Sequence, residues 1–513
     1  MHFSNTLTKI QMNRIDSNDL YQAYVRRMQK IADIKYASAL LQWDQETYMP
    51  VKGAPLRGQQ LATLTELSHE LFTSEETNSV LLELLGRKDL QDSQKRNVEL
   101  SFEDFTKQKK LPSEFVRKMV ETINRSFHSW IEARKENRFS RFEKDLTELV
   151  SLKKQEAEYL GYTQHPYNAL LNDYEKGATV ALIDAVFENL IPDLKKILDK
   201  ITSSRQVENG FLQQVFPKND QWDFGMQLLR EMNFDFEAGR QDISEHPFTT
   251  SFSNLDVRVT TRIDEKDFAN MTWSCIHELG HALYEQGLPT NQYGLPLGEA
   301  CSFSIHESQS RLWENQVGRS IGFWKHYFPI LQKRFANQMG KISVYDFYAG
   351  INKVEPSFIR TEADEVTYHF HVYVRYLLEK RLIEGSIEVR DIPKFWNEHY
   401  EKFLGVKVPD DIHGALQDVH WSHGSFGYFP TYSLGSFYAA QFYREAKRQL
   451  PGLEMDIESG KFGGLLGWLR SNIHEYGRFY TSEQLCSRVC GESLNIQYFT
   501  QYLLDKYGKI YQF

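Results

Sequence analysis

The sequence of 513 residues predicts a mainly α-helical protein that contains one short β-ribbon. Apolar residues recur every three or four positions through most of the chain, which is the spacing of amphipathic helices. The 15 prolines do not cluster and stand mostly at expected helix boundaries, as Pro50, Pro112 and Pro166 do. One segment, 248–263, departs from this pattern. Because neither a linker nor a repeat divides the chain, we expect a single domain over residues 1–513.

The helical spacing is clearest in the N-terminal third, residues 17–174. Leu, Lys, Glu and Gln follow one another there in segments such as LATLTELSHELF (61–72) and LTELVSLKKQEAEYL (146–160). The same spacing returns after residue 269. It predicts helices over residues 269–286, 300–317, 321–339, 364–384, 394–404 and 434–448.

The β-ribbon is expected at residues 248–263. β-Branched side chains occupy every second position there, at Val257, Val259, Thr261 and Ile263. A period of two places these side chains on one face of a strand. We therefore expect a small sheet at this point of the chain.

Composition and charge exclude several classes of protein. Hydrophobic residues make up 41% and charged residues 25% of the chain, as in soluble globular proteins. The net charge of -9 gives no basic field for a nucleic acid or an anionic membrane. No apolar stretch approaches the roughly 18 residues of a membrane span. The N-terminal residues 1–14 lack the apolar run of a secretory signal, so we expect a cytoplasmic protein with no nucleic-acid or membrane partner.

The segment HELGH at 277–281 predicts a zinc site. On a helix, positions i and i+4 share one face, so His277 and His281 can bind one ion. Glu278 stands in the same turn, where it can reach a water on the zinc and act as a general base. Gly287 and Pro289 follow and predict the end of this helix.

The sequence motif alone does not identify the third protein ligand of the metal. The metzincin pattern HExxHxxGxxH is excluded, because Tyr284 stands where its glycine belongs and no further histidine follows. A glutamate from a second helix is the other solution, and Glu299, Glu307 and Glu314 are the candidates. Arg311 lies one turn after Glu307 and could hold it, although the two could equally form an ordinary ion pair on a helix surface.

Several motifs together resemble the thermostable carboxypeptidase Taq-like family of zinc metallocarboxypeptidases. The resemblance runs from about residue 20 to the C-terminus. Its motifs, in chain order, are WDQETYMP (43–50), RGQQLATL (57–64), DVRVTTR (256–262), HELGH (277–281), HESQS (306–310), IRTEADE (359–365), GALQDVHW (414–421) and FGYFPTY (426–432).

The resemblance implies an elongated, helical, two-lobed body with a deep active-site groove, of the neurolysin-like kind. N-terminal helices at about 17–174 would roof this groove, and a zinc-binding core would span about 240–440. Glu307 would be the third ligand of one Zn²⁺ per chain, for which cobalt or another divalent ion could substitute. The implied activity is the release of C-terminal amino acids from peptides with a free C-terminus, with broad specificity, by a homodimer.

An exopeptidase of this kind must recognise a carboxylate, and Arg360 is the candidate for that role. A guanidinium binds a carboxylate through paired hydrogen bonds. Thr361 would cap a helix that starts next to Arg360 and aims it into a cleft. The alternative is a structural pair of Arg360 with Glu362 or Asp364.

Other candidate site residues lie in the remaining motifs. His420 and Tyr432 can donate hydrogen bonds to an oxyanion in the transition state, and Tyr428 could do the same. By the family's DxRxT motif, Asp256 and Arg258 would form a wall of the cleft. Two rival functions remain, a neurolysin-like endo-oligopeptidase and a non-catalytic peptide-binding protein stabilised by zinc.

Overall fold

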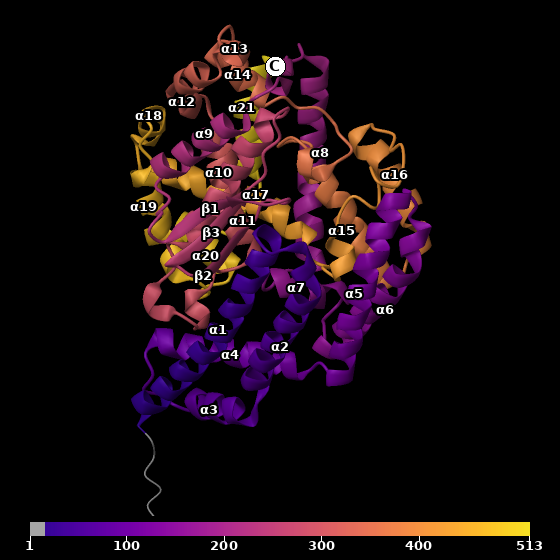
Figure 1. Ribbon diagram of the computed structural model, residues 1–513, viewed down its shortest axis with the longest axis vertical. Coiled ribbons are helices and arrows are strands. Elements are labelled where there is room, and N and C mark those ends of the chain that lie inside the picture. Colours follow the sequence, from indigo (N-terminus) through magenta and orange to yellow (C-terminus); the bar gives the residue numbers. More distant parts are fainter. Residues whose placement is uncertain (1–15) are drawn as a thin grey trace, which may run out of the picture.

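The computed structural model describes residues 16–513 and is mainly helical, with one small sheet (Figure 1). The predicted fold class is therefore confirmed. Residues 1–14, on which the expectation of a cytoplasmic protein depends, lie outside the described part of the chain. Among residues 16–513, no helix combines the length and the apolarity needed to cross a bilayer.

The N-terminal third begins at one end of the elongated molecule and then continues along its side (Figure 1). Its helices are α1 (Ser17–Thr47), α2 (Ala54–Thr73), α3 (Glu75–Leu85), α4 (Asp92–Lys109), α5 (Ser113–Glu136), α6 (Ser140–Leu160) and α7 (Tyr167–Tyr174). Helices α1 to α4 share a hydrophobic cluster of their own, in which Tyr24, Leu81 and Leu84 are fully buried. The Ser74 hydroxyl caps α3 by accepting a hydrogen bond from the Thr77 N–H at 3.2 Å.

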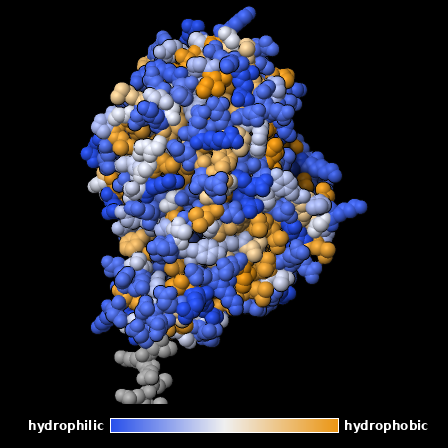
Figure 2. All heavy atoms as spheres, turned by 60° about the vertical axis from the view of Figure 1, so that its left-hand side comes forward, coloured by the Kyte–Doolittle hydropathy of each residue, from blue (hydrophilic) through white to orange (hydrophobic). Residues whose placement is uncertain are grey.

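The rest of the chain forms the larger part of the molecule, and its one large hydrophobic cluster also includes buried residues of α5, α6 and α7. Its other helices of at least eight residues are α8 (Val180–Ser203), α9 (Lys218–Glu231), α10 (Phe268–Glu285), α11 (Phe303–Arg311), α12 (Ile321–Arg334), α14 (Val344–Ile351), α15 (Tyr368–Glu384), α16 (Ile392–Leu404), α17 (Phe429–Gln449), α19 (Gly463–Asn472), α20 (Ser482–Cys490) and α21 (Gln497–Tyr511). The shorter α13 (Ala336–Met339) and α18 (Leu453–Glu458) lie between them in the sequence. Figure 2 shows one face of the molecule, where hydrophilic side chains predominate and apolar ones gather only in small groups.

The sheet has three strands in the order β1-β3-β2. The predicted ribbon is confirmed as β2 (Thr249–Ser253) and β3 (Asp256–Thr261), which pair antiparallel. Strand β1 (Gly239–Ile243) pairs parallel to β3 and was not predicted, because GRQDI shows no apolar alternation. Val257 and Val259 of β3 are buried in the cluster that also holds the apolar face of α10.

Several predicted helices differ in detail from the structure. The helix expected over 321–339 is divided into α12 and α13, and the one expected over 434–448 begins earlier, at Phe429 of α17. The helix expected over 300–317 is α11 followed by a π-helical turn, Leu312–Gly318. The prediction that Thr361 caps a helix is wrong, since α15 begins only at Tyr368. The carboxylate of Asp364 accepts hydrogen bonds from the N–H groups of Val366 and Thr367, both at 2.9 Å. Because Asp364 occupies these N–H groups, α15 starts later than predicted, and only a short 3₁₀ turn is formed at 360–362.

Candidate active site

Two helices bring together the side chains of the predicted metal site. His277 and His281 lie on α10, and Glu307 lies on the adjacent α11. The Nε2 atoms of His277 and His281 lie 3.7 and 3.5 Å from Glu307 Oε2. Ligands about 2.1 Å from a tetrahedral ion lie about 3.4 Å apart, so these atoms fit one metal ion. Among residues 16–513, this is the group of His, Cys, Asp and Glu side chains that could hold a metal.

The protonation states of the group suit a cation. Burial, together with the charge of His306, lowers the pKa of His281 to about 3, so its imidazole is neutral. Burial alone would raise the pKa of Glu307. Arg311, His277 and His281 together outweigh burial and lower that pKa, so the carboxylate is ionised. A neutral imidazole and a carboxylate are the forms that bind a divalent metal.

Glu314 orients His277 rather than joining the group. Its Oε2 lies 2.9 Å from His277 Nδ1, so Nδ1 donates to the carboxylate and Nε2 is left free toward Glu307. Arg311 Nε donates to Glu307 Oε1 at 2.7 Å, and its Nη1 donates to Glu314 Oε2 at 3.3 Å. Burial would lower the pKa of His277, but Glu307 and Glu314 outweigh burial and raise it. The site therefore attracts positive charge.

The structure distinguishes the three candidates for the third ligand, Glu299, Glu307 and Glu314. Glu307 belongs to the metal group, and Glu314 holds one of its histidines. Glu299 accepts a hydrogen bond from Arg478 Nη1 at 2.6 Å and does not belong to the group. The ion pair of Arg311 with Glu307 is thus part of the site rather than an isolated surface contact.

Glu278 is buried beside the metal group, with 8% of its surface exposed. The Thr249 hydroxyl of β2 donates to Glu278 Oε2 at 2.6 Å and fixes this carboxylate. Burial raises the pKa of Glu278 above its usual value, because a carboxylate loses hydration there. A carboxylate with a raised pKa is a stronger base, as proton abstraction requires.

Arg360 is buried and is held by Asp418 and Tyr368. Its Nε donates to Asp418 Oδ1 and its Nη1 donates to the Tyr368 hydroxyl, both at 3.0 Å. Its guanidinium lies 4.9 Å from the centre of the Tyr432 ring. Neither predicted acidic neighbour within IRTEADE pairs with Arg360. Its partner Asp418 comes from the motif GALQDVHW.

His420, Tyr428 and Tyr432 form one cluster with Arg360. His420 Nε2 and the Tyr432 hydroxyl are 3.0 Å apart, and the rings of Tyr428 and Tyr432 are 5.1 Å apart. Burial lowers the pKa of His420 to about 3, with a further contribution from Arg360, so His420 is neutral. The two tyrosines stay protonated, since burial raises the pKa of Tyr428 to about 12 and that of Tyr432 well above its usual value.

Tyr368 joins this cluster to the metal group. Its hydroxyl accepts the hydrogen bond from Arg360, and its ring lies 4.6 Å from the guanidinium of Arg311. Arg311 in turn binds Glu307. The structure therefore joins the metal group to Arg360, Tyr432 and His420 through Arg311 and Tyr368.

Asp256 and Arg258 lie apart from this network. Arg258 Nε donates to Asp256 Oδ1 at 3.0 Å, and its guanidinium lies 4.4 Å from the ring centre of Trp43 on α1. The pair therefore joins the exposed face of β3 to the N-terminal third. Trp43 begins the WDQETYMP motif, so this contact brings two of the recognised motifs together.

Comparison with known proteins places the chain in a family. The family model described as carboxypeptidase Taq (M32) metallopeptidase matches residues 23–507. The chain belongs to this family. Thermostable carboxypeptidase 1 of Thermus thermophilus is 38% identical over 505 residues, which cover 96% of this chain and 99% of that protein.

Solved structures agree with the family. The M32 carboxypeptidase from Deinococcus radiodurans R1 has a TM-score of 0.94 and 38% identity, and the match covers 96% of this chain and 100% of that one. A structure described as that of CHT has a TM-score of 0.94 and 56% identity, with 95% and 99% covered. The chain is thus a metallocarboxypeptidase of the M32 family, which implies a divalent metal, and the His277–His281–Glu307 group fits one.

A hollow of about 1100 Å³ opens next to the metal group of this M32 enzyme. It lies between α4 and α7 of the N-terminal third and the start of α11, and His306 and Glu285 line it. The ring of His306 stacks on His281 with centres 4.4 Å apart, so His306 lies between the hollow and this histidine of the metal group.

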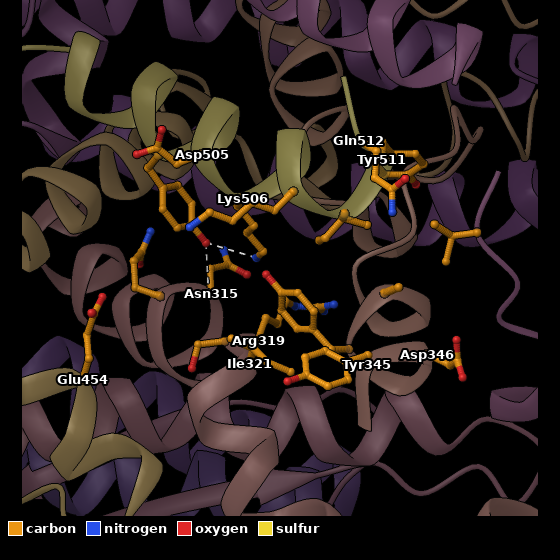
Figure 3. A pocket seen from close by; sticks show the side chains of 18 of the residues that line it. Asn315, Arg319, Ile321, Tyr345, Asp346, Glu454, Asp505, Lys506, Tyr511 and Gln512 are labelled. Atoms are coloured by element: carbon orange, nitrogen blue, oxygen red, sulfur yellow. Dashed lines mark hydrogen bonds between the residues drawn. The ribbon is translucent and has the colours of Figure 1, made fainter. Parts of the chain in front are cut away.

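A second hollow, of about 1170 Å³, lies behind the π-helical turn (Figure 3). Asn315, Arg319 and Lys506 line it, and Lys506 Nζ donates to the Tyr502 hydroxyl at 3.1 Å. None of the predicted site residues lines this hollow. It touches the metal site only indirectly, because Arg319 Nη2 lies 3.4 Å from Glu314 Oε1.

Sequence reasoning missed three residues of this M32 site. Glu314 was considered only as a rival ligand, although its i+3 spacing from Arg311 signals a shared helix face. Asp418 received no role, although it stands two positions before His420 in a recognised motif. Thr249, which fixes Glu278, carries no signal in the sequence.

Close helix packing positions Glu307, and substituting the glycine behind it tests this. A Cβ at Gly435 of α17 would lie 2.5 Å from Glu307 Cγ and 2.6 Å from Glu307 Cβ. Gly435→Ala must therefore displace the metal ligand, and we expect metal affinity to fall about 10- to 100-fold. Competition with a chelator measures this affinity. Gly467→Ala in α19, where a Cβ meets nothing within 4 Å, is the control. Equal affinities for both variants would contradict this packing argument.

Proposed function

We propose that this chain is a zinc-dependent carboxypeptidase that releases C-terminal amino acids from peptides with broad specificity. The observation that carries the proposal is the grouping of His277, His281 and Glu307 beside the buried carboxylate of Glu278. Two imidazoles and one carboxylate are the donor set of many catalytic zinc sites. A structural zinc would close all four positions with protein ligands, whereas this group has three.

His277, His281 and Glu307 would hold one zinc ion per chain, and cobalt or another divalent ion could substitute. When bound, the ion supplies Lewis-acid polarisation of the scissile carbonyl and of a water molecule. Glu278 takes a proton from the attacking water as the C–O bond forms. It then gives this proton to the leaving amine as the C–N bond breaks, which frees the C-terminal amino acid.

His420 and Tyr432 stabilise the oxyanion that develops on the carbonyl oxygen. Both are neutral donors in a buried setting, where a hydrogen bond to an anion is strong. Tyr428 packs against Tyr432 and can take part in the same role. His420 Nε2 and the Tyr432 hydroxyl share one hydrogen bond, and the oxyanion replaces this contact when substrate binds.

Arg360 recognises the free C-terminal carboxylate. Asp418 and Tyr368 occupy Nε and Nη1, and Nη2 makes no hydrogen bond with residues 16–513. This arrangement fixes the plane of the guanidinium while one of its nitrogens remains available. A demand for a free carboxylate separates this enzyme from a neurolysin-like endo-oligopeptidase.

Replacing Arg360 tests this recognition. We expect Arg360→Ala to lower kcat/KM about 100-fold for a peptide with a free C-terminus and far less for its C-terminal amide. Rates of product release from such a matched pair, with zinc-loaded and chelated enzyme, provide the measurement. If Arg360→Ala lowers kcat/KM equally on both peptides, Arg360 has only a structural role. If the unaltered enzyme cleaves the amide as fast as the acid, the endo-oligopeptidase is favoured.

Residues 1–513 form a single catalytic domain, in which helices at about 17–174 roof the groove over a zinc-binding core at about 240–440. Asp256 and Arg258 form part of the wall of this groove, and the contact of Arg258 with Trp43 supports that placement. The enzyme is cytoplasmic and homodimeric. Light scattering coupled to gel filtration measures the oligomeric state.

A further inference from the structure

Helix α15 carries two buried ionisable side chains, Arg375 and Glu379, on the side that packs against loop 420–428, which precedes α17. Arg375 and Glu379 stand one turn apart and are both fully buried. Arg375 Nε donates to Asp418 Oδ2 at 2.6 Å, and its Nη2 donates to Gln417 Oε1 at 2.7 Å. Arg375 thereby holds the residues that directly precede loop 420–428.

Glu379 holds the loop itself through one carboxylate. Trp421 Nε1 donates to Glu379 Oε1 at 2.8 Å, and the Gly427 N–H donates to Oε2 at 2.8 Å. The hydroxyl of Tyr167 on α7 donates to Oε2 at 2.5 Å. All three partners are donors, which an ionised carboxylate can satisfy together.

The residues that Glu379 binds adjoin the proposed catalytic donors. Trp421 follows His420 directly, and Gly427 precedes Tyr428 directly. Gly427 has φ +101°, and a Cβ there would lie 2.6 Å from Leu170 O, so the loop sits tightly on α7. A shift at Glu379 must therefore move the donors that flank the loop.

We propose that Glu379 is a positioning residue of the carboxypeptidase reaction, which holds loop 420–428 so that His420 and Tyr432 meet the oxyanion. The inference rests on the proposed function, because it assumes those two donors. Glu379 touches neither substrate nor metal in this account. It acts only through the loop.

The chemistry of the contact favours this role over simple packing. Burial raises the pKa of Glu379 to about 7 in spite of its three hydrogen-bond donors. Ionisation of Glu379 therefore lowers the free energy of unfolding as the pH rises. The charges that face it are few: Lys153 contributes a weak attraction, and Arg375 lies one turn along the same helix. A costly buried charge at a site is typical of a functional arrangement.

Glu379→Gln provides the main test, because it keeps the shape of the side chain. The new NH₂ group must face either the Trp421 Nε1–H or the Gly427 N–H, and neither of these groups can accept a hydrogen bond. We expect kcat to fall about 10- to 100-fold, while KM changes less than about threefold and the bound zinc stays at one per chain. Kinetics on a free-acid peptide, metal analysis and thermal unfolding provide these values.

Asp184→Asn is the matched control. Asp184 of α8 accepts hydrogen bonds from Tyr376 and Lys380, which lie on the same helix α15 as Glu379. If Asp184→Asn lowers Tm as much as Glu379→Gln and also lowers kcat as much, Glu379 is merely structural.

If Glu379→Gln does not fold, Tyr167→Phe provides the test instead, because it removes a single hydrogen-bond donor to Glu379. A loss in kcat with unchanged KM supports the proposal, and an unchanged kcat overturns it.

A double-mutant cycle separates this inference from the proposed function. If Glu379 acts through the loop, the effects of Glu379→Gln and Tyr432→Phe on kcat are not additive. Additive effects overturn the positioning role. If Tyr432→Phe alone leaves kcat unchanged, the proposed oxyanion role has failed instead.

Discussion

Glu278→Gln is expected to lower kcat about 10³- to 10⁴-fold while the protein keeps its metal. The carboxylate is buried beside the metal group and fixed by Thr249, so glutamine fills the same space but cannot accept a proton. His277, His281 and Glu307 are untouched, and the metal content should stay at one ion per chain. Steady-state kinetics on a free-acid peptide and elemental analysis of the same sample test both statements.

Thr249→Val is the control for this variant. It removes the hydroxyl that holds Glu278 Oε2 and leaves the base in place. We expect a loss of about tenfold, much smaller than that of the glutamine variant. If Glu278→Gln retained a tenth or more of the activity, Glu278 could not be the base.

Glu307→Ala is expected to abolish metal binding and, with it, activity. The substitution removes one of three ligands and leaves Arg311 without its main partner on α11. His277 and His281 alone cannot hold the ion against dialysis. Elemental analysis after dialysis, followed by an attempt to restore activity with added zinc, measures the effect.

Glu299→Ala is the matched control for the ligand, because Glu299 was a rival candidate in the sequence. Its carboxylate binds Arg478 away from the metal group, so this variant should keep its ion. Glu314→Ala should weaken metal binding about 10- to 100-fold without abolishing it, since Glu314 only orients His277. A full complement of zinc in Glu307→Ala would remove Glu307 from the site.

The fold could be predicted wherever a local pattern dictates it. The apolar spacing of 269–286 predicts α10 to within a residue at each end, and the alternation at 257–263 predicts β3. Strand β1 could not be predicted, since its pairing with β3 rather than its own pattern stabilises it. The start of α15 was missed because the side chain of Asp364 competes with the helix for backbone N–H groups.

The site could be predicted where its chemistry is local in sequence. HELGH places two ligands and a base on one helical turn, so spacing alone suffices. The choice among Glu299, Glu307 and Glu314 depends on how α10 and α11 pack, which spacing cannot supply. The partnership of Arg360 with Asp418 joins residues 58 positions apart, beyond the reach of any local pattern.

Anomalous diffraction at the zinc absorption edge, on crystals of the zinc-loaded enzyme, tests the central claim most directly. The account predicts one strong peak per chain, about 2.0–2.2 Å from the Nε2 atoms of His277 and His281 and from a carboxylate oxygen of Glu307, with the fourth position open to solvent. A peak elsewhere in the chain, or one closed by a fourth protein ligand, would contradict it.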